Sequence, residues 1–133
     1  MQICQSYIGG KSWPSSQPPI DKFYAATGEV IAQVEPATAE MLDEAVAIAS
    51  KAQRGWAALE AGQRGEILQR AATLMRTHND ELARLEVMDV GKSFGEAVSA
   101  DVPSGPDALA YFAALAQTGT GDMHRFGDAI AYS

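Results

Sequence analysis

The spacing of apolar residues divides the chain into three parts. Residues 1–37 alternate apolar and polar positions over short stretches that glycine and proline interrupt, which is typical of strands joined by turns. From residue 38 to residue 117 the apolar positions follow a period of about 3.6 residues, as amphipathic helices do. Residues 118–133 are rich in glycine and end in the run AIAYS, which predicts a loop and the start of a strand with no partner after it.

Two hairpins are predicted in the first 37 residues. Gly9-Gly10 separates two short arms, and Thr27-Gly28 separates residues 22–26 from residues 29–34. Glycine reaches positive φ without a steric cost, so both pairs suit tight turns. The stretch between the hairpins, PSSQPP at residues 14–19, predicts a loop because proline donates no backbone hydrogen bond. A two-stranded hairpin is marginal in water, so other elements are expected to cover both.

Capping signals place the first helix boundaries. The first helix is expected to begin after an N-cap at Thr38 and to end near Leu59, and the second to begin near Gln63. A third helix is expected after a fresh N-cap at Asn79, with Gly91 ending it. Apolar residues spaced at three and four positions predict the core faces of these helices: Met41, Ala45, Ile48, Ala52 and Trp56; Ile67, Ala71, Leu74 and Met75; Leu82, Leu85 and Met88.

The last helical stretch contains prolines. A capping box at Ser93–Glu96 predicts a helix as far as about Val102. Pro103 and Pro106 are expected to interrupt it, because proline lacks the N–H and clashes with the preceding turn. Residues 107–116 are expected to be helical again, and Pro106 either starts that helix or breaks one.

Length and charge exclude several classes of protein. A chain of 133 residues suits one small domain or part of a larger one. Its net charge of −7 argues against nucleic acid and anionic membranes as partners, because both require basic patches. There is neither a signal-peptide pattern nor an apolar stretch of the roughly 20 residues needed to span a bilayer. These features favour a soluble cytoplasmic protein.

The sequence offers no catalytic or cofactor-binding residue. Cys4, the only cysteine, lies in the first predicted strand with no base beside it, and it cannot form an internal disulfide. His78 and His124 lie in polar segments and are expected at the surface. Gly91-Lys92-Ser93 is similar to the end of a phosphate loop, but the required glycine five residues earlier is Glu86. Gly119-Thr120-Gly121 precedes no helix and predicts a turn.

Two acids have less ordinary surroundings. Asp89 lies at the end of the third predicted helix, where a negative charge opposes the helix dipole. It therefore needs a compensating partner, which could be Lys92, a backbone amide or a cation. Asp101 lies near Pro103, where backbone groups are freed, and a local cap or a salt bridge would explain it as well as a functional role would.

Several motifs in a fixed order carry a family resemblance. They are YIGGKSW, ATGEVIAQV, the Trp56 helix, RGEILQRAATLMRTHNDELARLEVMDVGK and SGPDALAYFAALA. This combination resembles the N-terminal region of NAD(P)-dependent aldehyde dehydrogenases, and most closely the betaine aldehyde dehydrogenase branch. The resemblance implies an α/β fold, or α+β for this chain alone. N-terminal β-hairpins would be followed by three to five helices, forming the outer part of the coenzyme-binding domain without its Rossmann sheet.

The resemblance also implies sites. Asp89 and a backbone carbonyl around Phe23 would share a monovalent cation, K⁺ or Na⁺, at a site that this chain leaves incomplete. Asp101 and Ser104 would lie near the substrate entrance, where an acid attracts a cationic aldehyde. The family usually has Asn-Pro where this chain has Tyr24-Ala25. NAD or NADP would bind the complete enzyme but not this chain, which is expected to be inactive alone.

Two functions remain open from the sequence. The first is a fragment of an aldehyde dehydrogenase that oxidises an aldehyde to the carboxylic acid, with a homo-oligomer as the expected assembly. The second is a non-catalytic helical module that buries its apolar faces against copies of itself or against a partner.

Overall fold

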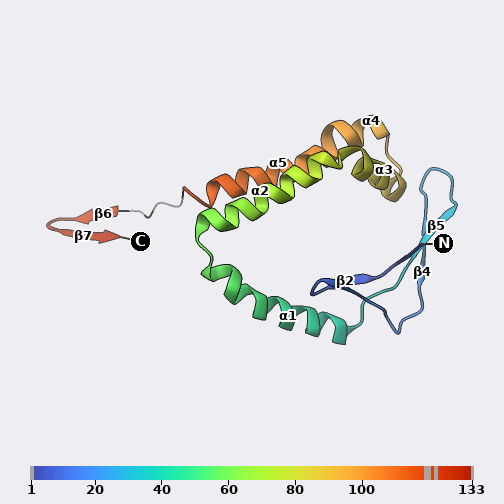
Figure 1. Ribbon diagram of the computed structural model, residues 1–133, viewed down its shortest axis with the longest axis horizontal. Coiled ribbons are helices and arrows are strands. Elements are labelled where there is room, and N and C mark those ends of the chain that lie inside the picture. Colours follow the sequence, from blue (N-terminus) through green and yellow to red (C-terminus); the bar gives the residue numbers. More distant parts are fainter. Residues whose placement is uncertain (1, 119–120, 122, 133) are drawn as a thin grey trace.

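The computed structural model describes residues 2–118, 121 and 123–132, so the predicted turn at Gly119-Thr120-Gly121 lies largely outside the described residues. Strands occupy both ends of the chain and helices the middle (Figure 1). The first strands are β1 (Gln2–Cys4), β2 (Ser6–Ile8), β3 (Lys11–Trp13), β4 (Ile20–Phe23) and β5 (Val30–Val34). The helices are α1 (Ala39–Ala58), α2 (Ala61–Thr77), α3 (Asn79–Val90), α4 (Phe94–Glu96), the π-helix η1 (Ala97–Asp101) and α5 (Val102–Leu115). Strands β6 (Met123–Phe126) and β7 (Ala129–Tyr132) follow.

Both predicted N-terminal hairpins are confirmed. Strands β2 and β3 pair antiparallel around Gly9-Gly10, whose φ angles are 59° and 86°. Strands β4 and β5 pair antiparallel around a turn in which Gly28 has a φ of 76°. β4 begins earlier than predicted, at Ile20, and ends at Phe23. β1 adds a parallel partner to β5, giving a three-stranded sheet in the order β1-β5-β4 that local spacing could not reveal.

The predicted start of α1 is confirmed, but its predicted core face is wrong. The Thr38 side chain accepts a hydrogen bond from the Met41 amide, and Leu59 follows the last helical turn. Met41 alone of the five predicted face residues is buried, and Trp56 is 39% exposed. Among the described residues, little packs on this stripe apart from the β2–β3 turn, where Gly9 lies against Ile48. The described residues therefore leave most of the apolar stripe of α1 uncovered.

Helices α2 and α5 form the closest packing in the chain. They lie side by side and run in opposite directions (Figure 1). The buried residues at this packing are small, and the predicted large residues Ile67 and Leu74 are 38% and 62% exposed. The buried small residues on the helices are Gly65, Ala72, Ala83, Ala97 and Ala113. Small side chains allow close backbone approach, so the helices pack through alanine and glycine and leave many large apolar side chains uncovered.

The helix break predicted at Pro103 and Pro106 is wrong. The chain is helical from Phe94 to Leu115, with the π-helix η1 between α4 and α5. In η1 the amide of Val102 bonds the carbonyl of Ala97, five residues earlier, which widens the turn just before Pro103. Pro103 lies in the first turn of α5, where a missing N–H costs little. Pro106 is fully buried inside α5, and its carbonyl accepts a hydrogen bond from Arg76.

The end of the chain also differs from the prediction. The strand at 129–132 does have a partner, because β6 precedes it and pairs antiparallel across Gly127-Asp128. Gly127 has a φ of 60°, as a two-residue hairpin turn requires. His124 therefore lies in a strand and not in a loop. In Figure 1 this hairpin lies away from the helices.

Candidate functional site

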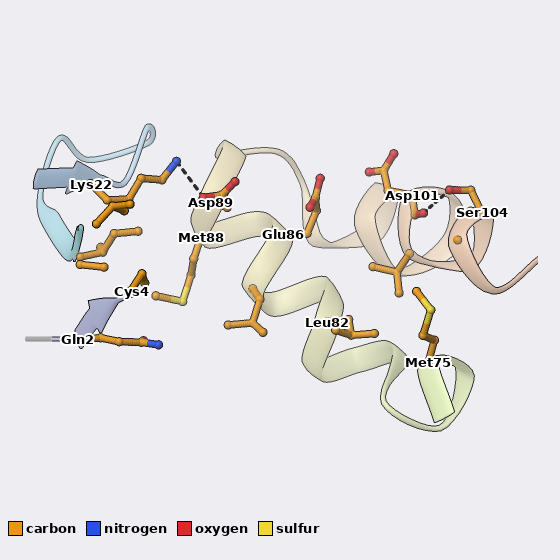
Figure 2. Close-up of a pocket in the computed structure, with 16 residues that line it drawn as sticks. Gln2, Cys4, Lys22, Met75, Leu82, Glu86, Met88, Asp89, Asp101 and Ser104 are labelled. Atoms are coloured by element: carbon orange, nitrogen blue, oxygen red, sulfur yellow. Dashed lines mark hydrogen bonds and ion pairs between the residues drawn. The ribbon is translucent and has the colours of Figure 1, made fainter. Parts of the chain in front are cut away.

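A groove of about 570 Å³ lies between the three-stranded sheet and the helices α3 and α5. Gln2, Cys4 and Lys22 face it from the strands, and Met88 and Asp89 face it from α3 (Figure 2). Asp101, Val102, Ser104 and Gly105 extend its wall at the start of α5. Most of the remaining lining is apolar, and three carboxylates lie along it against one ammonium. The groove can therefore accept an apolar surface or a group with positive charge.

The predicted cation ligand Asp89 has a partner within the chain. Its Oδ1 lies 2.9 Å from Nζ of Lys22 on strand β4, as Figure 2 shows. Among the described residues, Asp89 forms no ion pair with Lys92 and no hydrogen bond with a backbone amide, the two other partners that the sequence offered within the chain. Phe23, the second predicted ligand, directly follows Lys22 in β4, at an irregularity in the pairing with β5. The cation site itself stays a prediction.

The end of α3 lies directly against the β4–β5 turn. Gly91 ends the helix in the left-handed conformation, with a φ of 77°, as predicted. A Cβ atom at Gly91 would lie only 2.7 Å from the Cβ of Ala25. Glycine is required here by both conformation and space. This contact and the Lys22–Asp89 ion pair together join the sheet to the helices.

The two predicted entrance residues lie together. The Ser104 hydroxyl donates to the carbonyl of Asp101 at 2.6 Å, at the junction of η1 and α5. The carboxylate of Asp101 lies 2.5 Å from Nζ of Lys92. The hydrogen bond to Asp101 raises the pKa of the Lys92 ammonium above its usual value, and nearby acid charges, including Glu96, act in the same direction. Asp101 is thus part of a salt bridge, one of the two alternatives that the sequence left open.

The described residues contain no reacting group in a catalytic setting. Cys4 is the free thiol, and no described histidine or carboxylate hydrogen-bonds to it. His78 bonds Glu81 at the helix surface, and the ring of His124 lies beside Phe126. Within the described residues no group of histidine, cysteine and acid residues could hold a metal ion together. No helix in the described part of the chain is long and apolar enough to cross a membrane.

The comparisons with known proteins decide the family. The aldehyde dehydrogenase family profile matches residues 13–132, which is most of the chain. This chain belongs to the aldehyde dehydrogenase family. The predicted resemblance and the predicted α/β fold class are confirmed by this match and by the solved structures described next.

Three relatives define what the chain is similar to. Betaine aldehyde dehydrogenase from Cereibacter sphaeroides is 44% identical over 115 residues, covering 86% of this chain and 24% of that protein. A betaine aldehyde dehydrogenase point mutant from Staphylococcus aureus, solved with NAD⁺, superposes with a TM-score of 0.83 at 30% identity over 92% of this chain and 25% of that one. PnpE from Pseudomonas sp. WBC-3 gives a TM-score of 0.87 at 30% identity over 96% of this chain and 26% of that one. The chain thus spans about a quarter of the length of each of these three proteins.

Sequence reasoning missed the partners of both predicted acids. The sequence pattern places Lys22 in a strand and offers Lys92 as a partner for Asp89, whereas in the structure Lys22 pairs with Asp89 and Lys92 pairs with Asp101. No local spacing connects Lys22 with Asp89, because the fold brings a hairpin beside a distant helix end. Lys92 and Asp101 are closer in sequence, but the intervening π-helix sets their geometry.

Proposed function

We propose that this chain is the N-terminal part of an NAD(P)-dependent aldehyde dehydrogenase subunit that oxidises an aldehyde, with betaine aldehyde as its substrate, to the carboxylic acid. The observation that carries the proposal is the 44% identity to a betaine aldehyde dehydrogenase over 86% of this chain. In the complete enzyme the nicotinamide cofactor supplies a hydride acceptor. The cofactor of the complete enzyme would be NAD or NADP, and neither is expected to bind this chain.

The role proposed for the described residues is structural and electrostatic. The groove between sheet and helices offers apolar surface to the remainder of the subunit, which fits the many large apolar side chains left exposed. Asp101 and Ser104 would form part of the substrate entrance. Lys92 neutralises much of the Asp101 charge, so the attraction of a cationic aldehyde would depend on the carboxylates of the groove together, Glu86 included.

A second candidate is favoured by one specific observation. Many large apolar side chains of the described residues are more than one-third exposed, among them Leu42, Leu85 and Phe112. Surfaces of this kind mark interaction sites. A non-catalytic module that associates with copies of itself is therefore the alternative, and a homo-oligomer and a cytoplasmic location belong to both proposals.

Kinetics on the isolated chain test the first part of the proposal. The purified chain would be mixed with betaine aldehyde and NAD⁺ or NADP⁺. The absorbance at 340 nm should then rise no faster than in the same mixture without the chain. The Cys4→Ser variant is the matched control, because it removes the one thiol in the chain. A saturable rate that this substitution abolishes would contradict the proposal, since it would place the reacting group within these residues.

A further inference from the structure

The surroundings of the Asp89 carboxylate bear on the monovalent-cation site that the family resemblance implies. Asp89 is the penultimate residue of α3, where the free carbonyls of the last helical turn add to its negative charge. The Asp89 side chain is 64% exposed, so water reaches it. A positive charge still stabilises the carboxylate at this helix end, and a dissolved K⁺ or Na⁺ could supply that charge. The structure instead brings the Lys22 ammonium to 2.9 Å from Asp89 Oδ1.

We propose that the Lys22 ammonium takes the place of a dissolved monovalent cation at Asp89, so that this chain binds neither K⁺ nor Na⁺ there. One carboxylate carries one negative charge, and Lys22 neutralises it at contact distance. A second cation on the same carboxylate would lie a few ångströms from the ammonium, and like charges at that separation repel strongly. The Asp89 surroundings therefore fit a tethered cation and not a free one.

The fold holds the two partners beside each other. Lys22 is held on β4, an edge strand of the sheet, by its pairing with Ala32 of the central strand β5. On the helix side, Gly91 and Ala25 pack so closely that no side chain fits between them. The Lys22 side chain is 34% exposed, which indicates that it lies along the protein surface and does not extend into solvent. Ion pairs held from both ends lose less conformational entropy on pairing than free surface pairs do.

The neighbouring lysine does not compete for Asp89. Lys92 directly follows Gly91, but its ammonium bonds Asp101 at 2.5 Å and lies 3.9 Å from Glu96. Each of the two acids predicted as functional residues thus has its own ammonium: Lys22 for Asp89 and Lys92 for Asp101. Removing Lys22 therefore leaves the Asp89 carboxylate with no replacement ammonium among its near partners, and it becomes available to a dissolved cation.

Cation binding to the full chain tests the proposal directly. The ²³Na NMR line width would be measured during a titration of wild type, Lys22→Met and the double variant Lys22→Met/Asp89→Asn. Wild type should broaden the sodium signal no more than the double variant does. Lys22→Met should broaden it further, because it frees the carboxylate. Broadening by wild type that Asp89→Asn removes would overturn the proposal, since a dissolved cation would then bind despite Lys22.

Thermal unfolding supplies a second readout. Melting midpoints by circular dichroism would be compared in KCl and in choline chloride at equal ionic strength. Wild type and Lys22→Arg, which keeps a positive charge, should show no K⁺-specific shift. Lys22→Met should gain a rise of about 4 °C when K⁺ is about tenfold above its dissociation constant. Lys51→Met, which removes an exposed lysine of α1, is the charge-matched control and should gain none. A Lys22→Met variant that responds to K⁺ no more than Lys51→Met would also overturn the proposal.

Discussion

The ammonium of Lys92 lies 2.5 Å from the carboxylate of Asp101, joining the loop after α3 to the last residue of the π-helix. Asp101 raises the pKa of Lys92 in the folded chain above the usual 10.5. A raised pKa in the folded state stabilises the fold below the unfolded-state value, and this contribution is lost as pH rises through the folded-state value. The pair should therefore stabilise the chain at neutral pH and lose its effect in alkali.

This pH dependence can be measured by urea denaturation. The wild type should be more stable than Lys92→Met at about pH 8, and the difference should shrink by about pH 11.5. The Lys51→Met variant is the control, because Lys51 is an exposed lysine of α1 that forms no ion pair with a described residue. An advantage of wild type over Lys92→Met that stays constant across this range would contradict the assigned role of Asp101.

Substituting Gly91 should destabilise the junction between the sheet and the helices. Gly91→Ala places a side chain in the left-handed conformation and within 2.7 Å of the Ala25 Cβ. The conformation alone costs roughly 1–2 kcal/mol, and the contact adds to this. Gly55→Ala in α1 has open space around it and should stabilise the chain by up to about 1 kcal/mol. Equal effects of the two substitutions in chemical denaturation would show that the junction does not require Gly91.

The close packing of α2 on α5 predicts that two helical glycines respond differently to alanine. A Cβ at Gly65 would lie 2.9 Å from the backbone carbonyl oxygen of Ala113, so the helices must separate, at a cost of roughly 1–3 kcal/mol. A Cβ at Gly105 would meet only the mobile end of Met75, at 2.9 Å. Gly105→Ala should therefore be neutral or stabilising. Denaturation midpoints of the two variants test the prediction, which fails if Gly105→Ala is the more harmful.

The start of α1 should depend on a single side chain. Thr38→Ala removes the hydroxyl that accepts the Met41 amide, at an expected cost of about 1 kcal/mol. Few other contacts hold α1, so the loss should appear as faster amide hydrogen exchange in its first turn. Thr73→Ala is the control, because that hydroxyl bonds the Gln69 carbonyl within α2 and caps no helix. Unchanged exchange at the start of α1 would refute the capping role.

The boundaries set by local chemistry could be predicted from the sequence. The Thr38 cap, the glycine turn at Gly9-Gly10 and the left-handed Gly91 each depend on residues within a few positions. The boundary before α3 could also be predicted, but the N-cap residue is His78 and not the predicted Asn79. The side-chain amide of Asn79 instead donates a hydrogen bond to the carbonyl of Val98. Such features require only backbone sterics and nearby hydrogen-bonding groups.

The features that depend on distant packing could not be predicted. Apolar periodicity predicted core faces of large residues on α1 and α2, but α2 packs on α5 through small residues such as Ala72 and Ala113. A π-helix before Pro103 preserves a helix that proline normally breaks, and nothing in the local pattern distinguishes the two outcomes. The partner of Asp89 comes from another part of the chain, so only the fold reveals it.

A chimera tests the central claim most directly. The quarter of the Cereibacter sphaeroides betaine aldehyde dehydrogenase that matches this chain would be replaced by it, and NAD⁺ reduction with betaine aldehyde would be measured. The control is the Cereibacter sphaeroides enzyme from which the same quarter has been deleted. If the chain is the N-terminal part of such an enzyme, the chimera should oxidise the aldehyde with saturable kinetics while the truncated relative should not. A folded chimera with no activity above the truncated relative would contradict the account.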